Sequence, residues 1–497
     1  MRSLASLGAC FTALLGASCA ASQANITKPH SSAQILPSTF RPPQHFENVN
    51  LVRSINLEKG YVRETTNLVV QNIDTKPQTD YYLPFEDAII AKIGGIEVRD
   101  KKDASKAPYE VSLVEFDPAS PTQFYQIRLS PALAPKDQIT LAITFSTLSS
   151  LSPLPTTVGQ TDKHYLTYSF SAVFPSSYKT LKQKTKLKLP GADVPDYTVL
   201  SGAHSSENSE DPVKQGSTLT YGTFGEVPAG ASEAVSVRYE FTKPVNFVSS
   251  LERDLEVSHW GGNLATEERY MYENRAAALK GHFNRVQWAA SNYYNPATMA
   301  LKTFSMPLRK GSSEPYFIDD IGNISTSNFR PAGREPLLEL HPRYPVFGGW
   351  RFKFKVGWNA DLAGALRKLE GDQYVLKIPF LEGPKQAEGI SYEQVKVRIV
   401  LPEGATNVRF DTGTVPIVSS DITLHRTFMD TTGRTTLTLL AVNLVDELRG
   451  RDLVVTYDYP WVAGLRKPLT LLAGIFAVFT AAYLLSHVDV SIGRKET

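Results

Sequence analysis

The sequence predicts a mainly β protein with two antiparallel β-sandwich-like domains followed by one C-terminal transmembrane helix. Segments such as Val235 to Phe241 and Val395 to Leu401 alternate apolar and polar residues. Clusters such as Leu189-Pro-Gly-Ala192 separate these segments. This combination is typical of half-buried antiparallel strands joined by tight turns. Close to the C-terminus, Leu469 to Leu485 contains neither a charged residue nor a proline, which indicates a membrane-spanning helix.

The first 24 residues (1–24) are expected to be a signal peptide. Arg2 supplies a positive start, Leu4 to Leu15 is an apolar run, and Ala17 to Ala24 is rich in small residues where a signal peptidase can cut. A buried N-terminal helix is the alternative, but sequence rich in Ser, Pro and Gln follows at once. Residues 25–44 are therefore expected to form an extended arm.

Composition excludes several classes of protein. Hydrophobic residues make up 42% and charged residues 21%, which is typical of a folded chain. The two cysteines, Cys10 and Cys19, both lie in the expected signal peptide. The mature chain would then have neither disulfides nor thiolate metal sites. A net charge of +2 gives no reason to expect nucleic acid as a partner.

The body of the chain is expected to form two β domains, residues 45–245 and 250–463, because it contains a weak internal duplication. Thr185 to Ala192 resembles Val397 to Ala405, and Val235 to Phe241 resembles Leu453 to Tyr459 at almost the same offset. Two related domains would explain both matches. Chance similarity between amphipathic strands is the alternative.

Helical patterns are few in this body. Ala360 to Glu370 is one candidate for a short helix. Glu268 to Lys280 stays open, because three successive alanines favour a helix there while Tyr270 and Tyr272 suit a strand.

The transmembrane helix is expected over residues 468–488, followed by a short cytosolic tail, 489–497. Basic residues flank it on both sides, so charge does not set its orientation. The signal peptide does, and it places the bulk of the chain in the lumen. Ala473, Ala477 and Ala481 recur every four residues and are candidates for close helix packing.

Two sequons are candidate glycosylation sites, Asn25-Ile-Thr27 and Asn323-Ile-Ser325. Asn323 follows a glycine in a turn-like context and is the better of the two.

The sequence offers no catalytic constellation. It has no GxSxG, HExxH, P-loop or dinucleotide motif, and its nine histidines are widely spaced. The acidic pairs Glu267-Glu268 and Asp319-Asp320 could bind a divalent cation or transfer protons. Such pairs lie more often on solvated strand edges or turns. We therefore expect no catalytic residue, no cofactor and no metal site.

An unusual segment, Pro345 to Asn359, combines aromatic, glycine and basic residues. Phe347-Gly-Gly-Trp350 leads into a strand whose basic face, formed by Arg351, Lys353 and Lys355, is expected to meet lipid head groups, an acidic partner or only water.

Several separated motifs, in the same order, resemble the ribophorin I family of oligosaccharyltransferase subunits. The motifs that carry the resemblance are Tyr168 to Thr180, Tyr221 to Pro228, Val257-Ser-His-Trp-Gly261, Glu267-Glu268, Leu279-Lys-Gly281, Phe283-Asn-Arg285, Tyr316 to Thr326, Pro342-Arg-Tyr-Pro345, Phe347-Gly-Gly-Trp350, Gly371-Asp-Gln-Tyr374, Leu401-Pro-Glu-Gly-Ala405, Asp430-Thr431 and Gly433-Arg434.

The resemblance implies a single-pass type I protein of the endoplasmic reticulum membrane. The complex of that family transfers a preassembled oligosaccharide from dolichyl diphosphate to Asn in Asn-x-Ser/Thr of nascent proteins. The resemblance further implies a non-catalytic accessory subunit with a scaffold and substrate-presenting role. Its partners would be other subunits including the catalytic one, nascent polypeptides and membrane lipid.

A second function is compatible with the sequence, namely a membrane-anchored lumenal lectin-like or chaperone-like binding protein. The aromatic and glycine-rich segment from Phe347 to Trp358 motivates it. A membrane-bound hydrolase has no supporting motif.

Overall fold

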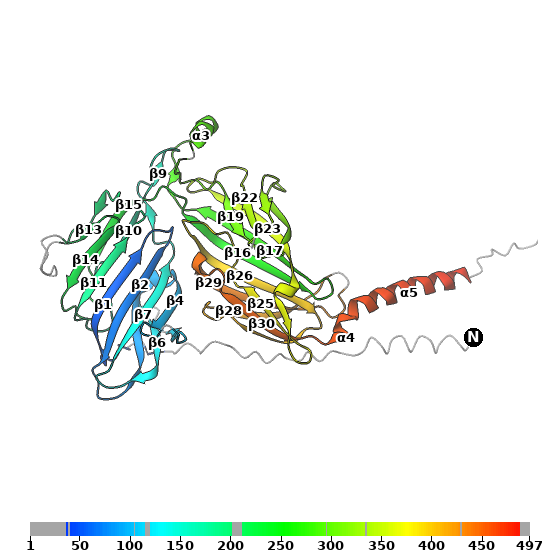
Figure 1. Ribbon diagram of the computed structural model, residues 1–497, viewed down its shortest axis with the longest axis horizontal. Helices are drawn as coiled ribbons and strands as arrows, with labels where there is room; N and C mark the ends of the chain where they lie inside the picture. The colour runs from blue at the N-terminus through cyan, green and yellow to red at the C-terminus, as the bar shows by residue number, and fades with distance from the viewer. Residues whose placement is uncertain are drawn as a thin grey trace, which may run out of the picture.

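Strands form most of the chain, as the sequence predicts, and one long helix projects from the end of the second half (Figure 1). The computed structural model describes residues 36–37, 40–103, 105–114, 120–200, 211–294, 296–332, 335–427 and 430–487. The expected signal peptide, Asn25 and the expected tail lie outside these residues.

The first half is a sandwich of one large sheet and two smaller ones. The large sheet contains, in spatial order, β13 (Val213–Gln215), β14 (Thr218–Phe224), β11 (Gln183–Lys188), β1 (Phe46–Asn56), β2 (Val62–Asn72), β7 (Gln138–Thr147) and β4 (Ile93–Asp100). The smaller sheets are β12 (Asp196–Tyr197), β15 (Ala234–Glu240), β10 (Tyr165–Ser171) and β8 (Ser152–Pro153), and β3 (Gln78–Glu86), β6 (Thr122–Leu133) and β5 (Glu110–Leu113). A short helix, α2 (Asp87–Ile90), precedes β4.

The second half has the same three kinds of sheet. Its large sheet contains β28 (Ser419–His425), β29 (Arg434–Val445), β26 (Ile390–Glu403), β16 (Asn246–Ser258), β17 (Asn263–Asn274), β23 (Arg351–Asp361) and β20 (Ser313–Asp319). The smaller ones are β27 (Thr406–Asp411), β30 (Asp452–Asp458), β25 (Gln373–Pro379) and β24 (Leu366–Lys368), and β19 (Phe304–Pro307), β22 (Leu337–Leu340) and β21 (Asn328–Arg330).

The remaining elements are short, apart from the last helix. They are β9 (Thr157–Val158), β18 (Ala278–Leu279), α3 (Arg285–Asn292), the 3₁₀ turns η1 (Leu362–Gly364) and η2 (Asp446–Leu448), α4 (Trp461–Gly464) and α5 (Arg466–Ser486).

The two halves repeat one topology. All three sheets recur with the same strand order, and in each large sheet the only parallel pair joins equivalent strands, β1 with β11 and β16 with β26, among the strands described. The first hairpin of each half shifts register at the same place, between Asn48 and Asn50 and between Val248 and Ser250. This agreement favours duplication over chance similarity between strands.

Register supports the particular alignment that the sequence suggests. Thr185 lies beside Arg53 in the first large sheet, and Val397 lies beside Arg253 in the second. Both arginines are buried, and each pairs with a glutamate of the neighbouring strand. Equivalent positions therefore carry equivalent buried ion pairs.

Apolar faces of the sheets enclose the cores. In the first half, Leu51 and Ile55 lie on the same face of β1. Leu51 packs in the cluster beneath the β3–β6 sheet, and Ile55 packs in the cluster beneath the β10–β15 sheet. A larger cluster fills the second half between the sheets there. Phe347 and Ala277, from the second half of the sequence, are fully buried in a core cluster of the first half. The halves thus share packed residues at their joint.

Polar contacts also join the halves. The Tyr61 hydroxyl donates to Asp446 Oδ1 at 2.5 Å. Asn443 Nδ2 donates to the carbonyl oxygens of Ala91 and Ile93 at 2.7 and 3.1 Å. The backbone N–H of Gly60 donates to the carbonyl of Glu388 at 2.8 Å. These bonds tie the β1–β2 turn and β4 to the second half.

Two segments with helix-forming residues are strands. The predicted helix from Ala360 to Glu370 is wrong: this segment ends β23, makes the single turn η1 and enters β24. Sheet pairing of its ends outweighs the local helix propensity of Ala and Leu. The open segment from Glu268 to Lys280 lies mostly in β17, where Tyr270 and Tyr272 are buried.

Candidate functional site at the start of the membrane helix

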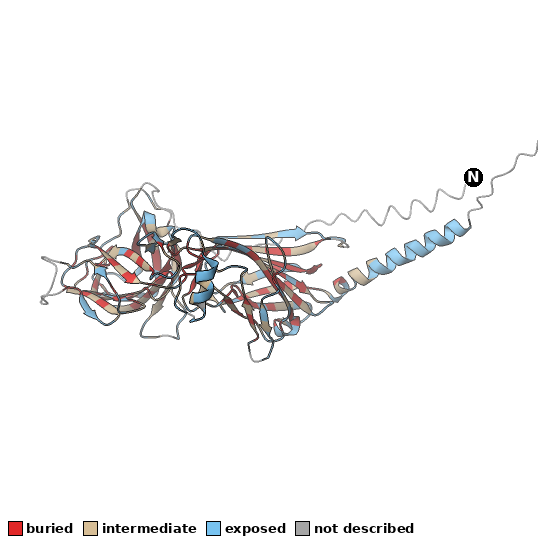
Figure 2. Cartoon of the chain, turned by 90° about the horizontal axis from the view of Figure 1, so that it is seen from above, coloured by how far each residue is buried: buried red, intermediate tan, exposed pale blue. Residues whose placement is uncertain are grey.

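Helix α5 has the length and composition of a membrane span. An 18-residue window within its 21 residues has a mean hydropathy of 2.0, and at about 1.5 Å per residue the helix matches a hydrocarbon core of about 30 Å. It is the one such helix among the described residues. None of its residues is buried inside the chain, as the exposed colouring in Figure 2 shows. Ala473, Ala477 and Ala481 therefore have open surroundings within this chain.

The chain enters α5 directly from the second sandwich. β30 leads into the short helix α4, and Leu465 then caps both helices. Ala463 of α4 is buried against the loop that follows β26. A Cβ atom at Gly404 would lie 2.8 Å from that of Ala463, and the φ of Gly404 is +95°. Glycine at position 404 therefore permits both the loop turn and the close approach.

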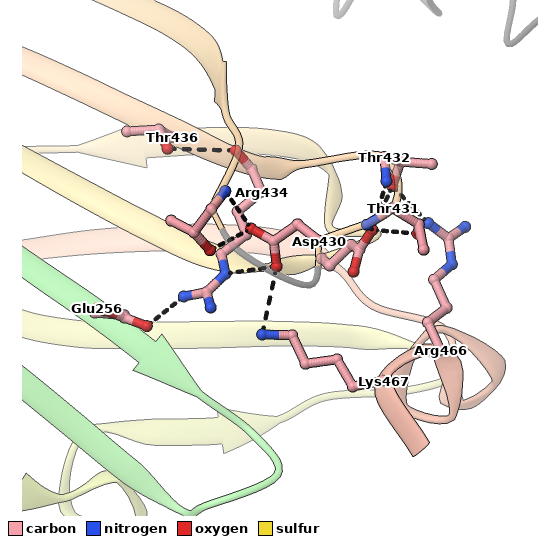
Figure 3. Close-up of polar contacts among 10 residues, drawn as sticks. Glu256, Asp430, Thr431, Thr432, Arg434, Thr436, Arg466 and Lys467 are labelled. Carbon is pink, nitrogen blue, oxygen red and sulfur yellow. Dashed lines mark hydrogen bonds and ion pairs between the residues drawn. The ribbon is translucent and has the colours of Figure 1, made fainter. Parts of the chain in front are cut away.

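A buried carboxylate holds the first turn of α5. Asp430 precedes β29, and its side chain is 0% exposed. It accepts hydrogen bonds from the N–H and the hydroxyl of Thr427, at 2.9 and 2.6 Å. Arg434 Nε and Lys467 Nζ each lie 3.4 Å from its Oδ1 (Figure 3). One carboxylate thus joins the loop, the strand and the helix.

These partners keep Asp430 ionised. Burial alone would raise the pKa of Asp430, but the hydrogen bonds from Thr427 and the charges of Arg434 and Lys467 outweigh it and lower the pKa to about 2. Arg434 also pairs with Glu256 of β16. The connection therefore reaches the central strands of the second large sheet.

A second carboxylate reinforces the same junction. Glu403, at the end of β26, is buried, and its Oε1 accepts from the N–H groups of Thr431 and Thr432 at 2.8 and 2.6 Å. The hydroxyls of both threonines donate to the same oxygen. Burial would raise the pKa of Glu403, but these bonds outweigh it and the pKa is lowered. Arg466 then donates to the hydroxyl of Thr432 at 2.9 Å.

The result is a fixed connection between domain and helix. Charge-assisted hydrogen bonds are stronger than neutral ones, and those to Glu403 are partly buried. The direction in which α5 leaves the second sandwich is therefore set by the fold. A tether of exposed polar residues would leave that direction free.

Replacing Asp430 with Asn should lower the stability of this connection by about 1–3 kcal/mol, because the partly exposed Arg434 and Lys467 lose the buried carboxylate charge that they share. The wild-type contribution should be present at neutral pH and disappear as the pH falls from 3.8, the ordinary value, towards about 2. Hydrogen exchange of the full chain in nanodiscs should speed up in residues 430–434 and 461–467. The matched variant Asp421→Asn, at an exposed position of β28, should leave exchange unchanged. Equal exchange in both variants would contradict the role given to Asp430.

Little in the sequence points to this junction. Asp430-Thr431 belongs to a family-like motif, and Glu403, Arg466 and Lys467 form no recognisable group in the sequence. A usable signal was present: an acidic residue and two threonines in one loop, with two basic residues at the start of the apolar run.

Both acidic pairs are engaged in ion pairs. Glu267 contacts Arg269 at 2.6 Å, while Glu268 pairs with the buried Arg253. Asp319 contacts Arg343 at 2.6 Å. Among the described residues, no group of three or more His, Cys, Asp or Glu side chains is placed to hold a metal ion.

The sequon at Asn323 lies on a well-held loop. Asn323 and Ser325 are exposed. Arg343 Nη2 donates to the carbonyl oxygens of Gly322 and Asn323 at 3.1 and 3.0 Å. The loop therefore presents the asparagine outward in a fixed backbone.

The aromatic and glycine-rich segment is a core element. Phe347, Phe352 and Trp358 are at most 3% exposed. A Cβ atom at Gly348 would lie 1.9 Å from the carbonyl oxygen of Ala277. Glycine at this position therefore allows the two backbone segments to pack in direct contact. The basic face is paired with acidic residues, for example Lys355 with Glu267 at 3.4 Å. The aromatic side chains that suggested a binding groove thus serve packing.

Comparison with known proteins gives one consistent family. The family model described as Ribophorin I matches residues 46–486. Subunit 1 of the dolichyl-diphosphooligosaccharide--protein glycosyltransferase of Schizosaccharomyces pombe is 29% identical over 444 residues, which cover 89% of this chain and 95% of that protein. Subunit 1B of Arabidopsis thaliana is 28% identical over 92% of this chain and 96% of its own length. A solved structure of yeast LTA4 hydrolase with Bestatin covers 42% of this chain and 31% of its own at 12% identity, but its TM-score of 0.28 carries no inference.

Proposed function

The chain belongs to the ribophorin I family, and we propose that it is a non-catalytic accessory subunit of the oligosaccharyltransferase complex. That complex would transfer a preassembled oligosaccharide from dolichyl diphosphate to Asn of Asn-x-Ser/Thr in nascent proteins. The observation that carries the proposal is the similarity to relatives named as subunit 1 of this glycosyltransferase across about nine tenths of the chain.

The proposed role is that of a scaffold that presents substrate. The Asp430 and Glu403 junction supports it, because a domain fixed to its membrane helix can hold a surface at a constant place above the bilayer. The shared packing of Phe347 supports it too, since it couples the first sandwich to the second. The proposed domains are residues 45–245 and 250–463.

The proposed location is the endoplasmic reticulum membrane, with one span and both sandwiches in the lumen. Partners would be other subunits including the catalytic one, nascent polypeptides and membrane lipid. One long apolar helix at the end of the described chain supports a single span.

Depletion of the protein tests the function. Glycoproteins that carry several sequons should then appear with fewer glycans, and wild-type protein should restore them. Normal occupancy of all sequons after complete depletion would contradict the proposal.

The alanine stripe is proposed as the surface through which α5 packs against another subunit. Ala477→Leu together with Ala481→Leu should reduce recovery of the other subunits severalfold, because bulkier side chains separate the helices. The matched control is Ala482→Leu, which lies on another side of α5. Equal recovery of the complex with the double variant and the control would reduce α5 to a membrane anchor.

Asn323 is proposed as a glycosylation site, and Asn25 stays a second candidate. Asn323→Gln should shift the protein to lower apparent mass by one glycan on a gel. Endoglycosidase treatment should remove the difference between variant and wild type. An unchanged position before treatment would exclude modification of Asn323.

A further inference from the structure

Large apolar side chains are exposed at the end of the second sandwich where α5 begins. Trp260 is 73% exposed, Trp461 is 70% exposed and Val462 is 55% exposed. Trp260 lies in the turn between β16 and β17, far in sequence from α4. Leu369, in the turn between β24 and β25, is 49% exposed. Separate segments thus bring apolar surface to one end of the domain.

Buried contacts hold these segments together. His259, next to Trp260, bonds through Nε2 to the Tyr457 hydroxyl at 2.7 Å, and its ring lies 4.5 Å from that of Tyr459. The N–H of Tyr459 donates to the carbonyl of Asp372 at 2.8 Å, which fixes the β24–β25 turn beside β30. Trp260 and Lys467 line the same small cavity of about 80 Å³. The exposed tryptophan is therefore adjacent to the first turn of α5.

The equivalent end of the first half is covered by the second half. In the first half the equivalent turn, between β1 and β2, contacts the second half through Gly60 and Tyr61. In the second half the corresponding turn carries Trp260, which is 73% exposed. Among the described residues, the element that continues from this end is the membrane helix α5.

The chemistry of the patch fits the surface of a bilayer. Tryptophan is enriched at the boundary between hydrocarbon and head groups, where its ring is apolar and its N–H can meet water or phosphate. Arg466 adds positive charge at the same level, where it can meet the phosphates of lipid head groups. An exposed apolar patch of this kind is uncommon on a surface that faces water.

We infer that this end of the second sandwich lies on the membrane, with Trp260 and Trp461 in the lipid head-group region. The inference rests on the proposed membrane span of α5. It adds a second attachment beside the helix, so that the sandwich is held at a fixed height as well as in a fixed direction. Helix α3 lies far from this end, as Figure 1 shows.

Quenching by brominated lipids tests the inference. The full chain is placed in phosphatidylcholine nanodiscs with bromine either near the head groups or deep in the acyl chains. Bromine near the head groups should quench part of the tryptophan fluorescence. That quenched part should fall in both Trp260→Phe and Trp461→Phe. The matched control Trp288→Phe, on α3, should leave the quenched part unchanged.

A variant with an added tryptophan separates the inference from the span it rests on. Phe476→Trp, in the middle of α5, should add fluorescence that deep bromines quench. If that signal is quenched while Trp260→Phe and Trp461→Phe change nothing, the helix spans the bilayer and the inference is wrong. Protection of Trp260 only after other subunits bind would also overturn it, because the patch would then be a protein contact. If Phe476→Trp is not quenched either, the proposed span itself fails.

Discussion

Arg253→Met should lower the free energy of unfolding by about 3–5 kcal/mol, because it leaves buried carboxylates without a counter-charge. Arg253 belongs to β16, is 1% exposed and contacts β17 and the loop after β25. It pairs with Glu268, and its Nη2 lies 2.7 Å from Glu382 Oε2. Tyr270 donates to the other oxygen of Glu268 at 2.6 Å. The network sits at the centre of the second sandwich.

The pH dependence of the stability of Arg253→Met should show whether the unpaired buried carboxylates cause the loss. Burial raises the pKa of Glu268 above its ordinary value, although Arg253 and Tyr270 oppose this. Without the arginine, the carboxyl should take up a proton more readily. The loss of unfolding free energy in Arg253→Met, relative to wild type, should therefore be largest at neutral pH and become smaller as the pH falls.

Two further variants separate charge from packing. Arg269→Met removes a half-exposed arginine with three acidic neighbours on the same hairpin, and it should cost about 1 kcal/mol or less. Adding Glu268→Gln and Glu382→Gln to Arg253→Met should restore part of the stability. Chemical denaturation of the full chain in detergent measures all three. A loss in Arg253→Met no larger than that in Arg269→Met would contradict the argument.

Gly94→Ala should open the contact between the two sandwiches. A Cβ atom at Gly94 would lie 1.6 Å from the carbonyl oxygen of Asn443, which belongs to β29 of the other half. Since the obstacle is backbone, the strands must move apart, and such overpacking costs about 1–3 kcal/mol or more. The side-chain bonds from Asn443 to Ala91 and Ile93 should be lost as well.

Hydrogen exchange locates the expected opening. Amides of residues 91–95 and 443–446 should exchange faster in Gly94→Ala, while those in the core of each sandwich stay protected. Gly191→Ala is the matched control, since a Cβ there meets nothing within 4 Å. Protection at the joint equal to that of the control would show that the halves are not held there.

Local patterns predicted most of the strands but not their partners. Alternation in Val235 to Phe241 and Val395 to Leu401 identifies half-buried strands, and both segments are strands in the structure. The parallel pairing of β1 with β11 joins segments more than a hundred residues apart, and no local period encodes it. The full repeat of three sheets became visible only through such pairings.

The candidate site shows the same limit. The apolar run that becomes α5 is visible in the sequence, because a span needs only local composition. The ion pair between Asp430 and Lys467 cannot be recognised in the sequence, because it depends on how the loop before β29 packs against the helix. Phe347 and Trp358 were predicted as possible binding residues from their type, but burial depends on tertiary packing and turned both into core.

Mild-detergent purification of the tagged protein, followed by mass spectrometry, tests the central claim most directly. The account predicts that the other oligosaccharyltransferase subunits, including the catalytic one, are recovered with this chain in near-equal amounts. A parallel purification through a tag on the catalytic subunit shows that the detergent preserves the complex. Recovery of this chain alone, under conditions in which that parallel purification yields the assembled complex, would contradict the account.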